Sequence, residues 1–165
     1  MIEPMLNELR QEAATTKRLL ERVPSDKLTW KPHSKSMSLG QLSLHVARIP
    51  GDLSRLAQLD EFDASATNFA PPQPDSREEI LAAFDESVSN AAEYLNTLTQ
   101  EFATATWRLT LHGNELFAMP RAWMLRSLLL NHWYHHRGQL SVYLRLLDVP
   151  IPVIYGRSAD ENPFA

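Results

Sequence analysis

The sequence predicts an all-α fold, a four-helix bundle with a small β-hairpin between helices three and four. Apolar residues recur every three or four positions in four separate segments. Only one short stretch, 106–118, alternates apolar and polar residues with a period of two. A chain of 165 residues can bury one core, and no segment between these elements resembles a domain boundary. We therefore expect one domain spanning residues 1–165.

The first helix is expected over residues 3–22 and to end before Pro24 and Pro32. Its apolar stripe contains Met5, Leu9, Ala13, Thr16 and Leu20.

The second helix is expected to begin at Ser38, because Ser38 and Gln41 have the Ser-x-x-Gln spacing of a capping box. Pro50 is expected to kink this helix, since it lacks the N–H that would bond to the carbonyl of Val46. The apolar stripe contains Leu42, His45, Ile49, Leu53 and Leu56.

The stretch LDEFDASATNFAPPQPDS, residues 59–76, loses the helical period and is expected to be a long surface connection. Ser76, with Glu79 in the capping position, should open the third helix. That helix is predicted as one element, with a stripe formed by Ile80, Phe84, Val88, Ala91, Leu95, Leu98 and Phe102.

A hairpin with turn residues Gly113 and Asn114 should precede the fourth helix. Pro120 suits the first turn of that helix, which is expected to run to about Leu147 and to stop before Pro150. Its core-facing stripe contains Leu125, Leu128, Leu129, His132, His136, Gln139, Leu140, Tyr143 and Leu147.

Composition narrows the classes of function. The 16 Lys and Arg residues against 20 Asp and Glu residues give a net charge of −4, so nucleic acid is not an expected partner. Cysteine is absent, so a transition metal would have to take His, carboxylate or water as ligands. The N-terminal residues do not resemble a signal peptide, and no run of roughly 20 apolar residues predicts a membrane span. A cytoplasmic protein that does not associate with membranes is expected.

Three histidines stand out as candidate metal ligands. His132 and His136 are four residues apart on the apolar stripe, so their side chains emerge about 40° apart, one helical turn along the axis. Such a pair can bind one ion, as in helical His-x-x-x-His zinc sites. His45 can complete the set if helices two and four are neighbours. His135 points about 60° away from His132 in the opposite direction, so it is left out of the ligand set and is expected to lie next to the ligands or at the surface.

Three histidine ligands with positions left for water are typical of catalytic metal sites. A metal-free bundle remains an alternative, in which the histidines bond to one another and acid unfolding begins near the histidine pKa. A non-catalytic stress-associated protein that binds metal or a small ligand is another alternative. A closed coordination sphere, completed by Asp160, Glu161 or another side chain, would favour that one.

The remaining polar residues are less decisive. Arg137 and Gln139 can orient ligands or bind substrate, although a solvated helix residue is at least as good an interpretation of Arg137. Gln139 is expected to face inward and to need a partner there. Tyr155, Asp160 and Glu161 can close over a pocket. His33 and His112 are expected to be exposed, and the tryptophans Trp30, Trp107, Trp123 and Trp133 to be packing residues.

The segments SLGQLSLHVARIPGDL and NHWYHHRGQLSVYLRLLDVPIPVIYG resemble those of the DinB/YfiT-like superfamily of metalloenzymes. The resemblance covers nearly the whole chain and is most specific where His-x-x-x-His runs into Arg-Gly-Gln-Leu. It implies an up-down-down-up four-helix bundle, a homodimer, and nickel, zinc or a similar divalent ion. By position, it carries the ligand roles to His45, His132 and His136.

Characterised members of that superfamily include enzymes that use low-molecular-weight thiols such as bacillithiol and mycothiol. The resemblance therefore implies a small-molecule substrate and a metal-dependent, transferase-like enzyme of the thiol S-transferase type, whose ion activates a thiol or water. No distinctive thiol-binding motif is present in the sequence, so the substrate class stays open.

Overall fold

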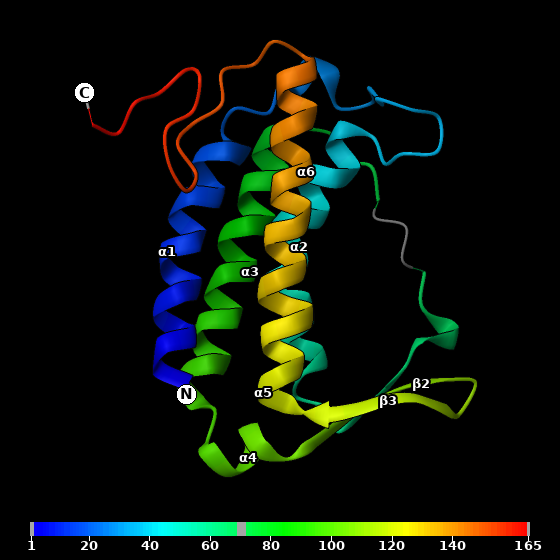
Figure 1. Cartoon of the computed structure of the whole chain (residues 1–165). Coiled ribbons are helices and arrows are strands. Elements are labelled where there is room, and N and C mark those ends of the chain that lie inside the picture. Colours follow the sequence, from blue (N-terminus) through cyan, green and yellow to red (C-terminus); the bar gives the residue numbers. More distant parts are fainter. Residues whose placement is uncertain (1, 69–71, 165) are drawn as a thin grey trace.

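The computed structural model describes residues 2–68 and 72–164, which are mostly helical and include one small three-stranded sheet. Four long segments dominate Figure 1. They are α1 (Ile2–Leu20), α2 (Leu39–Leu56), α3 (Arg77–Thr97), and α6 (His132–Leu146) preceded by α5 (Arg121–Met124) and a π-helical stretch (Leu125–Asn131). A mostly helical chain with a hairpin before its last long helix is therefore confirmed.

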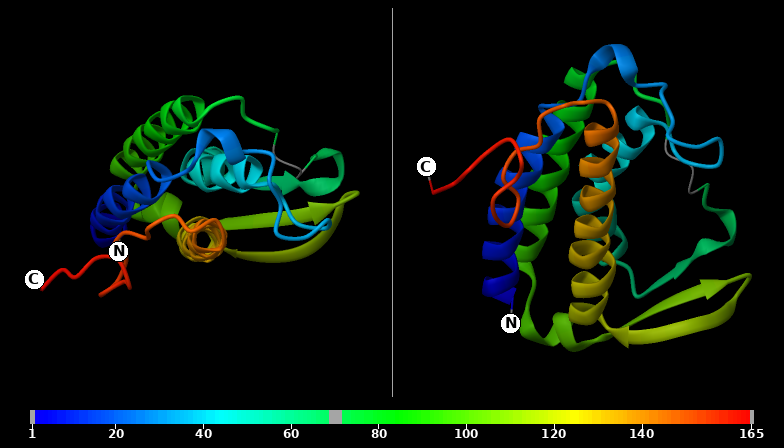
Figure 2. Two further views of the ribbon diagram at one scale, coloured as in Figure 1. Left: turned by 90° about the horizontal axis from the view of Figure 1, so that it is seen from above. Right: turned by 45° about the horizontal axis from the view of Figure 1, so that its top comes forward.

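The long helices pack side by side in pairs. α3 contacts both α1 and α2, and α2 also contacts α6. The left view of Figure 2 looks along α6, and in Figure 1 α1 and α6 run in one direction while α2 and α3 run in the other. Gly51 of α2 lies so close to α3 that an added Cβ would stand 2.9 Å from the Cα of Ser87. The Ser87 hydroxyl also accepts a hydrogen bond from the Gly51 N–H at 2.7 Å.

The start of α2 agrees with its prediction, since Ser38 and Gln41 form the capping box. The helix continues through Pro50 to Leu56. The carbonyl of Val46, which Pro50 cannot bond, accepts a hydrogen bond from the indole Nε1 of Trp133 at 2.9 Å. Because Pro50 leaves the Val46 carbonyl without a donor in α2, this carbonyl can bond to Trp133, and the bond joins α2 to α6.

The prediction of one helix from Ser76 to Phe102 is wrong. Ser76 caps the start as expected, but α3 ends at Thr97 and Leu98 has an extended backbone. Thr99 then caps the separate α4 (Gln100–Thr104) by accepting from the Phe102 N–H. Leu98 is nevertheless buried, so the apolar period of the sequence continues across the break.

The hairpin is confirmed, with a shifted turn. Strands β2 (Thr106–Leu111) and β3 (Asn114–Pro120) are antiparallel, and the two loop residues are His112 and Gly113, both with positive φ, as in a type I′ turn. The turn therefore begins one residue earlier than predicted. Pro120 ends β3, and the next helix begins at Arg121.

The long connection after α2 contains a strand that the sequence did not predict. Strand β1 (Glu61–Asp63) pairs in parallel with β2. The carboxylate of Asp63 accepts backbone hydrogen bonds from Ser65, His112 and Gly113, which lower the pKa of Asp63 to about 2. This contact ties the connection to the hairpin. Residues 69–71 of the predicted connection lie outside the described residues.

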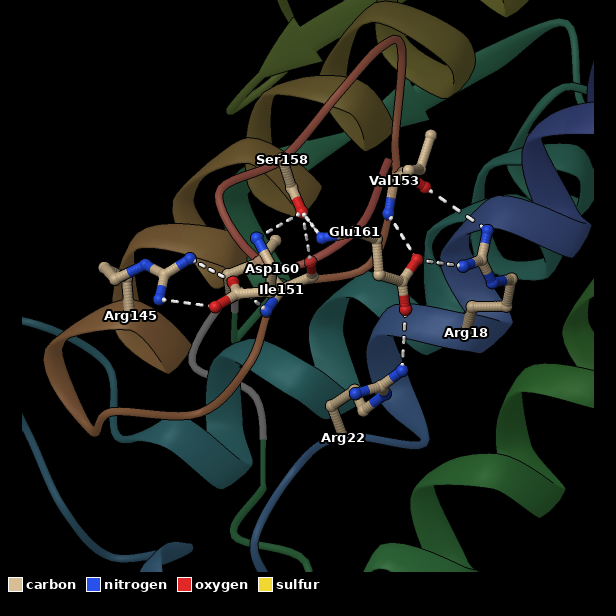
Figure 3. A network of polar contacts seen from close by, with 8 residues as sticks. All are labelled: Arg18, Arg22, Arg145, Ile151, Val153, Ser158, Asp160 and Glu161. Carbon is tan, nitrogen blue, oxygen red and sulfur yellow. Dashed lines mark hydrogen bonds and ion pairs between the residues drawn. The ribbon is translucent and has the colours of Figure 1, made fainter. Parts of the chain in front are cut away.

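The C-terminal tail folds back over the ends of α1 and α6 (Figure 3). Asp160 pairs with Arg145 and accepts from the Ile151 N–H, while Glu161 pairs with Arg18 and Arg22. The tail carboxylates thus bind Arg145 of α6, Arg18 of α1 and Arg22 just after α1. In the ranges 2–68 and 72–164, no helix is both long and apolar enough to cross a membrane.

Candidate metal centre

His132 and His136 lie at the edge of the buried face of α6, directly after the π-helical stretch. That face contains Trp133, Arg137 and Leu140, which are buried. His132 and His136 are half-buried beside it, toward α2. The prediction that both lie on the buried face therefore holds in part, because each is half-buried and neither is fully buried.

The structure brings His45, His132 and His136 together. Their candidate ligand nitrogens all lie within 4.8 Å of one another, and all three side chains are half-buried. The ring centroids are 4.5 Å apart for His45 and His136, 4.5 Å for His132 and His136, and 5.3 Å for His45 and His132. Because α2 contacts α6, the expected neighbourhood of the two helices is also present.

Hydrogen bonds fix which nitrogens face one another. The Nδ1 of His136 lies 2.8 Å from Oε1 of Gln139, a carbonyl oxygen that can only accept, so Nδ1 carries the proton. The ring of His132 donates a hydrogen bond to the backbone of Leu128. Because Nε2 of His132 faces His136, the donor is Nδ1. The two Nε2 atoms are 2.8 Å apart. In neutral rings both then present lone pairs to each other.

The electrostatics of the cluster favour neutral imidazoles. Burial lowers the pKa of His45 to about 4, and His136 and His132 add to this effect. Burial also lowers the pKa of His132 and of His136. Neutral imidazole is the form that coordinates a metal ion, so the site keeps its ligand form at neutral pH.

The neighbouring polar residues differ from their expected places. Gln139 is exposed and does not face inward, yet its amide bonds to His136 and, at 3.1 Å through Nε2, to His135. His135 is exposed, as expected. Arg137 is 1% exposed and pairs with Glu12, so its interpretation as a solvated residue is wrong. The sequence carried no signal for this pair, because its partners are 125 positions apart.

Other expectations have mixed outcomes. His33 and His112 are exposed, as predicted. Trp107 and Trp133 are buried and Trp30 packs against the core, but Trp123 is 66% exposed and is not a packing residue. Tyr155, Asp160 and Glu161 lie against α1 and α6, where Tyr155 bonds to Glu12 and the carboxylates bind arginines. Among the described residues, the histidine cluster contains no carboxylate.

Comparison with known proteins places the chain in a family. The model of the DinB family matches residues 1–162. The chain belongs to the DinB family. The uncharacterized protein YrdA of Bacillus subtilis is 27% identical over 150 residues, which cover 91% of this chain and 85% of YrdA.

Two solved structures share the fold. A DinB-like protein from Bacillus cereus superposes with a TM-score of 0.72 at 22% identity, covering 93% of this chain and 97% of that one. The DinB-like protein YjoA from Bacillus subtilis has a TM-score of 0.70 at 18% identity, covering 91% and 96%. At such identities the comparison establishes the DinB-like fold alone.

Proposed function

We propose that the protein is a divalent-metal-dependent enzyme whose ion is held by His45, His132 and His136. The facing Nε2 atoms of His132 and His136 carry the proposal, since two lone pairs 2.8 Å apart repel unless a cation lies between them. Nδ1 of His136 is occupied by Gln139, so a change of tautomer would sacrifice that hydrogen bond. A metal ion shared with His45 removes the repulsion and keeps both outer hydrogen bonds.

The donor set fits a transition metal. Imidazole nitrogen suits zinc and nickel, and the sequence offers no cysteine as an alternative ligand. An ion bound by three histidines and open to a further ligand lowers the pKa of a thiol or water and so supplies a nucleophile at neutral pH. The tail carboxylates that would have closed the coordination sphere are bound to arginines, which favours catalysis over the non-catalytic alternative.

We further propose a reaction of the thiol S-transferase type on a small molecule. The chain has no cysteine, so a sulfur nucleophile has to come from a low-molecular-weight thiol. The resemblance to superfamily members that use such thiols supports the same reaction type. The protein's own residues keep His45, His132 and His136 neutral by partial burial and orient His136 through Gln139.

The metal claim is tested by elemental analysis of the purified protein. Wild type should contain about one equivalent of nickel or zinc, and the His132→Ala and His136→Ala variants far less. His33→Ala, an exposed histidine away from the cluster, is the matched control and should keep its metal. Unchanged stoichiometry in both cluster variants would overturn the metal site.

The reaction is tested separately. Metal-loaded protein is incubated with a reactive electrophile and with bacillithiol, mycothiol or glutathione, and the conjugate is measured by mass spectrometry. Conjugate should form faster than without protein and should depend on His132. A lack of turnover with all three thiols would refute the transferase proposal while leaving the metal site standing.

The proposal includes the architecture and the assembly. We take α1, α2, α3 and the α5–α6 segment as the four helices of an up-down-down-up bundle in a single domain, which the helix directions in Figure 1 support. We also propose a cytoplasmic homodimer that binds neither nucleic acid nor membrane. Sedimentation at several protein concentrations tests the dimer.

A further inference from the structure

A cavity of about 430 Å³ lies directly beside the histidine cluster, and the residues that line it indicate which kind of substrate would fit. His45 and His132 form part of its lining, so a bound molecule would reach the metal site. The volume falls in the range of small-molecule pockets, roughly 300–1,000 Å³. The inference that follows rests on the proposed function in one respect: it places the reacting end of the substrate at the histidine cluster.

One wall of the cavity is apolar. It is formed by Leu53 and Leu56 of α2 and Phe62 of β1, all half-buried and packed against the core. Phe62 is held there by the pairing of β1 with β2, in register with Leu109. The apolar part of a substrate can pack against this wall and exclude water. The wall has no charged group that could recognise a polar end of the substrate.

The charged part of the lining is a row of three residues on the same helix. Arg55 lies 3.0 Å from the carboxylate of Asp52, and Arg48 lies 3.6 Å from it. Two guanidinium groups thus share one carboxylate, which leaves the row with one positive charge in excess. In the described part of the chain, Asp52 is the one acidic partner within ion-pair distance of either arginine.

Arg48, Asp52 and Arg55 lie at increasing distances from His45 along α2, so they can contact the far end of an elongated ligand that reaches the histidines. Arg48 follows His45 by three residues and Arg55 by ten, which are about 4.5 Å and 15 Å along an α-helix. The row also borders a second hollow, but Glu79 and Glu86 line that one. An anion is therefore favoured on the histidine side, where the ion would add further positive charge.

We propose that this cavity binds a substrate or thiol that has an apolar body and a terminal carboxylate, with the carboxylate recognised by Arg48 and Arg55. Asp52 pairs with Nε of Arg48 and with one terminal nitrogen of Arg55, and the two arginine side chains are 45% and 69% exposed, so their other N–H groups can donate to a bound carboxylate. The apolar body lies against Leu53, Leu56 and Phe62, and the opposite end reaches His45 and His132.

Two thiols that differ only at their far end test the proposal. Isothermal titration calorimetry compares 6-mercaptohexanoate with 6-mercapto-1-hexanol on the zinc-loaded and the metal-free protein. The carboxylate should bind the zinc-loaded protein about tenfold more tightly than the alcohol, a difference typical of one charge-assisted contact. In the Arg48→Gln/Arg55→Gln variant the two affinities should become equal. Arg10→Gln, an exposed arginine on α1, is the matched control and should keep the preference.

The outcomes separate this inference from the proposed function. Equal affinities in wild type, or a preference that persists in the double variant, would overturn the carboxylate site. If zinc leaves the affinity of both thiols unchanged, the role of the metal in thiol binding fails. The carboxylate preference can still be read from the two probes in that case.

Discussion

Gln139 holds His136 in the tautomer whose free nitrogen faces the other two histidines. Its Oε1 accepts from Nδ1 of His136 at 2.8 Å, and its Nε2 lies 3.1 Å from His135. Partners of this kind typically change metal affinity by 10- to 100-fold, because they fix the orientation and the basicity of the ligand. The Gln139→Ala variant should therefore bind zinc at least about tenfold more weakly in a competition titration with a chelator.

Gln11→Ala, an exposed glutamine of α1, is the control for that titration. It should bind zinc like wild type. Equal zinc affinity in the Gln139→Ala variant would show that the tautomer of His136 is set by something else.

The pKa of His45 makes the metal-free protein sensitive to acid. Burial, with His136 and His132, lowers this pKa from 6.5 to about 4 in the folded state. Between these values the unfolded chain binds a proton that the folded chain does not, so the free energy of unfolding decreases as the pH falls. His132 and His136 shift in the same direction.

With EDTA present, the urea midpoint should be lower at pH 5 than at pH 7.5, and the drop should be smaller in His45→Gln. The exposed His33→Gln should retain the full wild-type drop. A drop in His45→Gln as large as in wild type would assign the acid sensitivity to other groups.

The sequence allowed the three histidines to be predicted because each has a local signal. His132 and His136 have the i, i+4 spacing, and His45 interrupts an apolar stripe. Gln139 was singled out as well, although its exposure was not predicted. The buried pair of Arg137 and Glu12 had no such signal, since it depends on how α1 and α6 pack and not on either helix alone.

At the scale of elements, apolar periodicity predicted where helices form better than where they end. The break at Leu98 was missed because Leu98 is buried in phase with α3, and only the hydroxyl of Thr99 marks the new start. Strand β1 has three residues and pairs with residues 47 positions away, so no local alternation reveals it. The π-helical stretch is equally invisible, since its leucines suit an α-helix as well.

The bond from Trp133 to Val46 links two elements through the position that Pro50 vacates. Trp133→Phe removes the donor and leaves a buried carbonyl unpaired, which should cost about 1–3 kcal/mol in the free energy of unfolding measured with urea. Pro50→Ala restores an N–H that can bond to Val46 within α2. The cost of Trp133→Phe should therefore be smaller in the Pro50→Ala background.

This double-mutant cycle isolates the hydrogen bond from the packing that the smaller ring also loses. Trp123→Phe, at a side chain that is 66% exposed, should change stability by no more than about 0.5 kcal/mol. If Trp133→Phe lowers the free energy of unfolding equally in the wild-type and Pro50→Ala backgrounds, the N–H restored at position 50 does not satisfy the Val46 carbonyl.

At the scale of the whole molecule, Arg137 joins α1, α6 and the tail, which are distant in sequence. Its guanidinium pairs with Glu12 at 2.5 Å and bonds to Thr16 and to the hydroxyl of Tyr155, and Tyr155 donates to Glu12. The Arg137 side chain is 2% exposed and that of Glu12 15%. The pair therefore lies largely out of water, and the guanidinium carbon of Arg137 lies 5.0 Å from the ring centroid of Tyr155.

Removing one partner of a buried pair costs more than removing both. Arg137→Met should lower the free energy of unfolding by about 3–5 kcal/mol, because Glu12 keeps a charge without its partner. Glu12→Leu combined with Arg137→Met replaces both charges by apolar groups and should recover most of that loss. Urea unfolding of wild type, both single variants and the double variant measures the coupling. If the double variant loses as much stability as the two single variants together, the two charges act independently.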